Sequence, residues 1–184
     1  MSNEGVWKSV AVPSRLYARG SSKPLAGARV AVKDCFDLAG VQTTQMSRSY
    51  MELYGPLQES ADFVKRLIEL GATIVGKTKM TAFASSDEPT DQYIDFHCPF
   101  NPRGDMYQSP SGSSAGAAAA LAGYPWLDYS IGADSKIIAA SIVLSAYLLL
   151  AAGSIRAPAT CNGLFSLRTS FNSTSMRGVT AGCQ

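Results

Sequence analysis

The sequence predicts an α/β protein in which short buried strands alternate with helices. Residues 28–36 (ARVAVKDCF) and 72–75 (ATIV) are short, apolar and rich in β-branched side chains, a pattern typical of buried strands. Between them, residues 63–70 have the periodicity of an amphipathic helix, and Gly71 follows as a C-cap residue. Because strands and helices alternate, we expect a layered α/β fold.

Each further element follows from its side chains. In the first helix, Phe63, Leu67 and Leu70 share one face, which predicts that this face is buried. Residues 113–122 are small and mostly alanine, which has the highest helix propensity, so they predict a second helix. Residues 87–112 are polar and rich in Pro, Asn and Asp, and we expect them to be mostly loop.

The composition indicates a globular protein without an electrostatic partner. The 184 residues are 46% hydrophobic, and the net charge of +2 comes from scattered basic residues, so we expect no nucleic-acid partner. Residues 1–20 lack the apolar core of a signal peptide. The cysteines Cys35, Cys98, Cys161 and Cys183 lie far apart without a CxxC pair. We therefore expect a cytoplasmic protein with reduced thiols, no metal site and no cofactor.

Two short motif matches do not fit their structural context. Residues 71–78 (GATIVGKT) match the phosphate-binding loop, but that loop needs a strand before its first glycine and a helix after its lysine. Here the predicted order is helix then strand, so we expect two glycines that bound a helix–strand unit. Residues 112–116 (GSSAG) match the nucleophile elbow, whose serine needs a later histidine. His97 comes earlier, so a histidine for this role would have to lie outside this sequence, and we expect His97 to be a loop or core residue.

Two serine-bearing segments and one lysine remain as candidates for acyl transfer at an amide or ester. Residues 110–123 and 153–163 carry the serines, and Lys33 ends the apolar run of the first strand. Where histidine is absent, a neutral lysine can activate a serine. Lysine titrates near ~10.4, so half-neutralisation at pH 7 needs a shift of about 3.4 units, which burial can supply. Asp34 should face away from Lys33, because side chains alternate along a strand. The alternative is that Lys33 ends the strand and reaches solvent.

Several segments, in the same order, resemble the amidase signature family. They are residues 31–34 (AVKD), 71–80 (GATIVGKTKM) with Phe83, 101–102 (NP), 110–123, 132–134 (GAD), 153–159 (GSIRAPA) and 162–164 (NGL). The resemblance covers nearly everything from Pro24 onward, so residues 1–23 form an N-terminal extension. It implies one incomplete domain over residues 1–184, with a mixed central sheet covered by helices on both faces. The last residues show no closing helix or strand pattern, which is typical of a truncated chain.

The resemblance also implies a catalytic role for three side chains. Lys33 is the base, Ser113 relays the proton from a cis peptide, and Ser154 is the nucleophile that forms an acyl-enzyme. Backbone N–H groups of Ala152, Gly153 and Ser154 form an oxyanion hole, in which each donor is worth about 3 kcal/mol. The alternative for Ser113 is a helix N-cap, a role that it could fill at the same time.

Supporting residues and departures from the family pattern follow from the same resemblance. Asp134, Arg156 and Ser114 would fix the catalytic loop. Residues 111–116 read SGSSAG where the family usually has GGSSGG, and Ala133 replaces a common threonine. All of these replacements are small residues, and none of them removes a catalytic group.

An apolar insertion separates Asp134 from the candidate nucleophile. The family runs D-T-G-G-S-I-R, whereas here Ser154 lies twenty positions after Asp134, which leaves sixteen extra residues, 136–151. An apolar segment of this length is at the lower limit for a membrane-spanning helix, and a buried helix is the other translated alternative. If the segment is translated, we predict an inactive chain, because misplacing a reacting group by about 1 Å can cost about 100-fold in rate.

A third hypothesis is that residues 136–151 are an untranslated intron. Ser135-Lys136 can be encoded with GTAAG, a typical intron start, and Leu150-Ala151 with TTAG, a typical intron end. Removing the 48 nucleotides between these points leaves Asp134-Thr followed by Ala152-Gly153-Ser154, close to the family pattern.

Three functions remain open from the sequence. The first is an amide hydrolase for a small-molecule substrate, with Ser–cisSer–Lys catalysis and no membrane partner. The second is a truncated or decayed family member without catalytic activity. The third is the A-type subunit of an amidotransferase, in which the same residues release ammonia for transfer to a carried acyl group. The sequence leaves the oligomeric state open.

Overall fold

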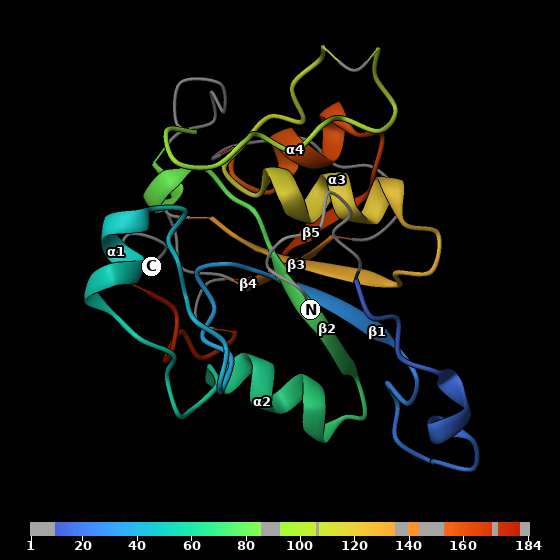
Figure 1. The fold of residues 1–184 in the computed structure, drawn as a ribbon. Coiled ribbons are helices and arrows are strands. Elements are labelled where there is room, and N and C mark those ends of the chain that lie inside the picture. The colour runs from blue at the N-terminus through green and yellow to red at the C-terminus, as the bar shows by residue number, and fades with distance from the viewer. Residues whose placement is uncertain are drawn as a thin grey trace.

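The computed structural model describes residues 10–85, 93–105, 107–134, 140–143, 153–170 and 173–180, and Figure 1 shows their fold. The elements in chain order are η1 (Arg15–Ala18), β1 (Arg29–Lys33), α1 (Arg48–Leu53), α2 (Asp62–Glu69), β2 (Thr73–Thr78), η2 (Ala82–Ala84), α3 (Ala115–Gly123), β3 (Tyr129–Ala133), β4 (Ala140–Val143), α4 (Arg156–Cys161) and β5 (Ser166–Arg168). For β4 only the backbone is described.

The sheet is built on three parallel strands. Its order is β2-β1-β3-β4-β5, and β1 runs parallel to both β2 and β3. The α/β class is thus confirmed, and this core corrects the prediction of a mixed central sheet. Antiparallel pairing occurs only where the short strands β4 and β5 extend the β3 edge. The core strands are parallel because helix-containing connections return the chain to the same end of the sheet, whereas β4 follows β3 without a helix among the described residues.

The predicted helix–strand unit is present with small shifts at its ends. The helix predicted at 63–70 is α2, and Gly71 follows it with a φ of +100°, as its C-cap position requires. The strand predicted at 72–75 is longer, because β2 pairs along the whole of β1. The unit therefore has the order helix, glycine, strand, and the phosphate-loop match at 71–78 is a helix end followed by a strand.

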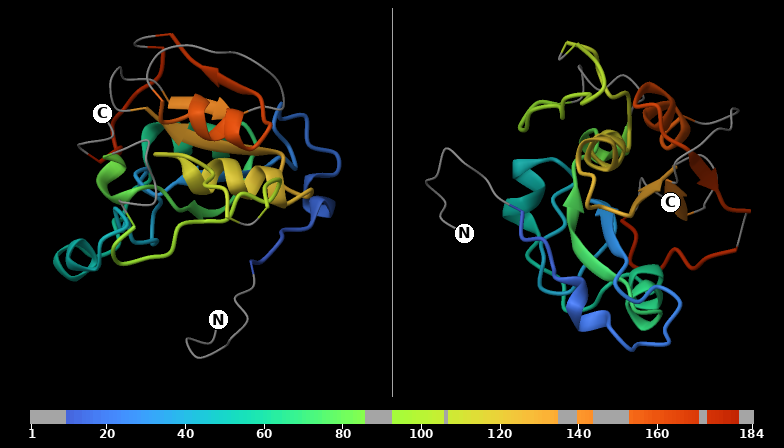
Figure 2. Two further views of the ribbon diagram at one scale, coloured as in Figure 1. Left: turned by 90° about the horizontal axis from the view of Figure 1, so that it is seen from above. Right: turned by 90° about the vertical axis from the view of Figure 1, so that its right-hand side faces the viewer.

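Helices lie on both faces of the sheet, as Figures 1 and 2 show from three sides. Val30 and Val32 are fully buried and pack in one cluster with Val64 and Leu67 of α2. Because side chains alternate along a strand, Lys33 points to the other face, where α3 and α4 lie. The alternation thus places a lysine, rather than a valine, next to the serine-bearing segments.

Gly116, which has no side chain, lets α3 approach the end of β2. A Cβ atom on Gly116 would lie 2.5 Å from the backbone nitrogen of Lys79. Instead, the Gly116 N–H donates to the Lys79 carbonyl at 2.9 Å. This close contact fixes the beginning of α3 beside the carboxyl ends of the parallel strands.

A second close approach brings α4 onto β3. A Cβ atom on Gly132 would lie 2.9 Å from Ser114 Oγ and 3.0 Å from Ile155 Cγ1. Ile155 is itself buried, in a cluster with Ala118 and Ala159. Both serine-bearing segments therefore pack over the same glycine of β3.

Most of the apolar insertion lies outside the described residues. Of residues 136–151, the structure describes only the backbone of β4, which pairs with β3 and β5. Within the described part of the chain, no helix has the length and apolar character needed to cross a membrane.

Candidate active site

Lys33 lies at the carboxyl end of β1 and is completely buried. Its Nζ donates to Ser113 Oγ at 2.7 Å and to the Ala133 carbonyl at 2.8 Å. The alternative of a strand-end lysine that reaches solvent is therefore wrong. Burial of this kind disfavours a charged ammonium.

Ser113 is held at the beginning of α3. The Gly112–Ser113 peptide bond is cis, as the family resemblance implied, and Ser113 is fully buried. The Ser113 carbonyl accepts a hydrogen bond from the Thr81 N–H at 3.1 Å, which ties it to the segment after β2. The N-cap position of α3 is Ser114, so the alternative of an N-cap at Ser113 is wrong. Ser111 stands where the family usually has glycine. Its φ of +61° lies in the region that favours glycine.

Ser154 returns to the same place from the far side of the insertion. It is buried, lies just before α4, and its carbonyl accepts a hydrogen bond from the Ser114 N–H at 3.0 Å. The Gly153 carbonyl accepts from the Ala157 N–H at 2.9 Å in the first turn of α4. The third residue of the predicted oxyanion hole, Ala152, lies outside the described residues.

The three supporting residues border the same site. Ser114 Oγ donates to the Ala133 carbonyl at 3.3 Å, so this one carbonyl accepts from both Ser114 and Lys33. Asp134 follows β3 directly and is buried, and Arg156 is the first residue of α4. The end of β3 is thus the place where the lysine and both serine segments meet.

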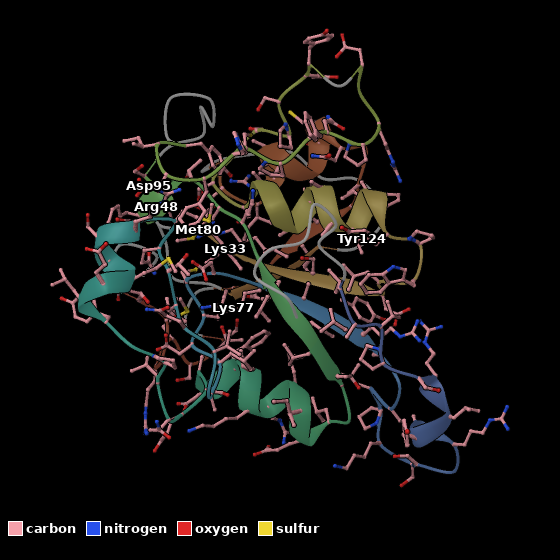
Figure 3. All side chains as sticks on the ribbon, in the orientation of Figure 1. Lys33, Arg48, Lys77, Met80, Asp95 and Tyr124 are labelled. Carbon is pink, nitrogen blue, oxygen red and sulfur yellow. The ribbon has the colours of Figure 1, made fainter. Side chains whose placement is uncertain are left out.

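A buried ion pair beside Lys33 was missed by the sequence reasoning. Lys77 Nζ lies 3.0 Å from Asp34 Oδ1, and the two side chains are only 7% and 6% exposed. The register pairs Lys77 with Val32, so Lys77 and Asp34 lie on the sheet face opposite to Lys33, and the predicted orientation of Asp34 is confirmed. Figure 3 labels both lysines, Lys33 at the end of β1 and Lys77 on β2. The pair could have been predicted from the sequence, because Asp34 and Lys77 have opposite charges and lie at the ends of two adjacent strands.

The histidine is a loop residue, and the described cysteines form no disulfide. His97 is an exposed loop residue, and its carbonyl accepts a hydrogen bond from Lys79 Nζ at 2.8 Å. Cys35, Cys98 and Cys161 are reduced thiols, and Cys183 lies outside the described residues. Burial raises the pKa of the Cys98 thiol, with Lys79 opposing that rise. Among the described residues, no three His, Cys, Asp or Glu side chains gather as a metal site would require.

A groove of about 650 Å³ lies along the edge strand β2, separate from the lysine–serine pair. Its lining includes Ala31, Val75, Phe100, Tyr124 and Trp126. The groove is mostly apolar, and none of Lys33, Ser113 and Ser154 lines it.

These features define a class of α/β protein with paired serine segments gathered over a buried lysine at the carboxyl end of a parallel sheet. A comparison with protein-family models matches residues 10–184 to the family described as Amidase. The chain belongs to the amidase signature family, and the resemblance noted from its motifs is confirmed.

Curated relatives and solved structures agree with this assignment. The chain is 35% identical over 157 residues to the glutamyl-tRNA(Gln) amidotransferase A subunit of Sulfolobus acidocaldarius, covering 85% of this chain and 28% of that protein. For the protein of the same name from Deinococcus deserti, identity is 33% over 186 residues, covering 97% of this chain and 32% of the relative. This chain therefore spans about a third or less of the curated relatives that it matches.

Solved structures show the same partial fold. An amidase family protein from Bacillus anthracis superposes with a TM-score of 0.67 at 25% identity, over 89% of this chain and 30% of that one. A peptide amidase from Stenotrophomonas maltophilia superposes with a TM-score of 0.53 at 27% identity, over 76% of this chain and 25% of that one. The chain thus has a partial amidase fold.

Proposed function

We propose that this chain belongs to an amide hydrolase that cleaves the C–N bond of a small-molecule substrate through a serine acyl-enzyme. The observation that carries the proposal is the buried contact of 2.7 Å between Lys33 Nζ and Ser113 Oγ. A second support is the hydrogen bond from the Ser114 N–H to the Ser154 carbonyl, which joins the two serine segments. A cytoplasmic location, without a nucleic-acid or membrane partner, belongs to the same proposal.

The proposed reaction begins with a neutral Lys33. In its neutral form the amine keeps one N–H on the Ala133 carbonyl and takes the proton of Ser113 Oγ across the 2.7 Å contact. Ser113 in turn takes the proton of Ser154 Oγ. The Ser154 oxygen then attacks the substrate carbonyl carbon and forms a tetrahedral intermediate.

Collapse of that intermediate completes acylation. The N–H groups of Ala152, Gly153 and Ser154 stabilise the oxyanion in this proposal. The proton held by Lys33 returns through Ser113 to the leaving nitrogen, the C–N bond breaks, and the acyl group stays on Ser154. Water, activated through the same relay, then cleaves the ester and restores the free serine.

Labelling with a fluorophosphonate probe tests the proposal. Because a translated insertion is predicted to displace the nucleophile, the reaction is measured on the 184-residue chain and on a form lacking residues 136–151. We expect the shortened form to be labelled at Ser154, and S154A, S113A or K33M to abolish the label. The matched control is S21A, which removes an exposed serine far from Ser154 in the sequence. It should be labelled like the form that carries Ser21. A label that persists in S154A contradicts the proposal.

A second candidate function is favoured by the names of the curated relatives. Several relatives with 32–35% identity are A subunits of glutamyl-tRNA(Gln) amidotransferases. In such a role, Lys33, Ser113 and Ser154 would hydrolyse the side-chain amide of glutamine and release ammonia for transfer by companion subunits. Ammonia release from glutamine, but not from simple aliphatic amides, would favour this candidate. The reverse preference would favour the stand-alone hydrolase.

A family member without catalytic activity is the remaining candidate. The chain covers only 28% of its relative from Sulfolobus acidocaldarius, so a large part of the family's length is not represented. A folded chain that reacts with no fluorophosphonate, with or without residues 136–151, would favour this candidate over both enzymes.

A further inference from the structure

The ion pair between Asp34 and Lys77 lies directly behind the proposed base. Lys33 and Asp34 are consecutive, so their side chains leave the end of β1 on opposite faces of the sheet. Asp34 Oδ1 accepts from Lys77 Nζ at 3.0 Å, and Oδ2 accepts from the Thr44 N–H at 3.0 Å. Thr44 Oγ1 donates to the same Oδ2. Both oxygens of a buried carboxylate are therefore occupied.

Lys77 is fixed by contacts of its own. Its Nζ donates to Thr43 Oγ1 at 2.8 Å, and the Thr43 hydroxyl donates to Asp37 Oδ1 at 2.8 Å. Thr43 thus bridges Lys77 and Asp37. The carboxylate in direct contact with the Lys77 ammonium is that of Asp34. This arrangement is more than a chance contact, since the side chains of Thr43 and Thr44 and the Thr44 N–H hold the two charges in one geometry.

We propose that Lys77 is a positioning residue for Lys33 and acts by compensating the charge of Asp34. This inference rests on the proposed function, in which Lys33 must lose its proton to serve as the base. A buried carboxylate near a lysine favours the charged ammonium. With Lys77 paired to it, Asp34 adds little net field at Lys33, and the amine remains available as a base.

The other charged groups around Lys33 do not change in the test that follows. Asp37 follows β1 and faces Thr43. On β2 and just after it, Lys79 turns outward to the His97 carbonyl. On the α4 side, Asp134 and Arg156 carry opposite charges. Variation at Asp34 and Lys77 therefore changes only the field from the far face of the sheet.

The experiment follows the charge of Lys33 itself in the 184-residue chain, by NMR of lysine labelled with carbon-13 at Cε. K33M identifies the resonance by its loss. We expect D34N, which leaves Lys77 unbalanced, to lower the titration midpoint of Lys33 by about one pH unit. K77M should raise the midpoint by a similar amount, and the double variant D34N/K77M should return it to the wild-type value.

Further variants allow the Lys33 titration to be interpreted even if K77M does not fold. K77M leaves a buried carboxylate alone and can unfold the chain, so D34N and the double variant carry the test in that case. K77R keeps the positive charge and should leave the midpoint unchanged. The control K65M removes a lysine from an exposed pair with Glu59 and should also have no effect. An unchanged midpoint in D34N, or a double variant whose midpoint differs from the wild-type value, would overturn the inference and leave the pair a structural one.

The readout separates this inference from the proposed function. NMR reports the protonation of Lys33 whether or not Ser154 reacts. A chain that titrates as expected but resists fluorophosphonate, with or without residues 136–151, contradicts the proposed function and supports the coupling. A form that is labelled at Ser154 while D34N leaves the Lys33 midpoint unchanged supports the function and overturns the coupling.

Discussion

Gln45 carries a buried amide group that has no partner among the described residues. The side chain is 1% exposed, and neither Nε2 nor Oε1 makes a hydrogen bond there. An unpaired buried polar group costs about 1–3 kcal/mol, so replacing the amide by an apolar side chain of similar shape should help. We expect Q45M to increase the free energy of unfolding by about 1 kcal/mol. Urea denaturation followed by circular dichroism measures it.

Gln42 is the matched control for this prediction, because its amide is used. Its Nε2 donates to the Met51 carbonyl at 2.6 Å and to the Tyr54 carbonyl at 2.5 Å. The same change, Q42M, should lower the free energy of unfolding by about 1 kcal/mol. If Q45M destabilises the chain as Q42M does, then Gln45 is paired with residues that the structure does not describe.

Cys98 and Cys161 should differ in their reaction with iodoacetamide. Burial raises the pKa of Cys98, so a smaller fraction of it is thiolate at pH 8 than for an ordinary thiol. Cys161 is exposed. We therefore expect Cys161 to be alkylated first at pH 8 and Cys98 to gain rate only as the pH rises further. Peptide mass spectrometry at several pH values measures both rates, and C161S shows the Cys98 reaction without that of Cys161. Equal rates at pH 8 would contradict the prediction.

At the scale of elements, the contact of α3 with the end of β2 depends on Gly116. A methyl group there would press on the backbone of Lys79, which cannot move aside as a flexible side chain can. We expect G116A to lower the free energy of unfolding by about 1–3 kcal/mol. Denaturant titration gives the value. Because Ser113 lies just before this helix, labelling of the form lacking 136–151 should also become slower.

Gly123, at the other end of α3, is the control. A Cβ atom there would lie 3.5 Å from Pro102 Cβ, an ordinary contact. G123A should therefore be neutral or stabilise the helix by up to about 1 kcal/mol. Because alanine has the higher helix propensity, equal losses in G116A and G123A would mean that the close approach to Lys79 is not what makes Gly116 sensitive.

The element predictions succeeded where the pattern was local. The α2–β2 unit was predicted from side-chain periodicity and from Gly71, which are properties of neighbouring residues. The end of β1 was not, because the chain turns after Lys33, where the Phe36 N–H donates back to the Lys33 carbonyl at 3.0 Å. Strand direction was also missed, since it depends on which strands pair and not on their own residues.

At the scale of the whole molecule, the insertion at 136–151 should control activity. The structure returns Ser154 to hydrogen-bonding distance of Ser114, but productive attack needs finer placement than one backbone contact provides. We expect the form lacking 136–151 to react with fluorophosphonate at least about 100-fold faster than the 184-residue chain. The second-order labelling rate measures this, with S154A as the blank for each form. Equal rates would show that the segment is compatible with the site.

Sequencing of the mature transcript across codons 134–154 tests the intron hypothesis separately. A message shorter by 48 nucleotides would make the form lacking 136–151 the natural one. A message that keeps them would make the insertion part of the protein, with β4 as a genuine strand of the sheet.

The family, the order of the α2–β2 unit and the candidate catalytic side chains could all be predicted from the residues alone. Lys33, Ser113 and Ser154 could be selected because their motifs are short and each is read along the chain. The tertiary structure alone decided that Lys33 contacts Ser113, eighty residues away, and that Asp34 pairs with Lys77 behind it. The reason is physical: such contacts depend on the order and register of the parallel strands β2, β1 and β3, which no local pattern of residues specifies.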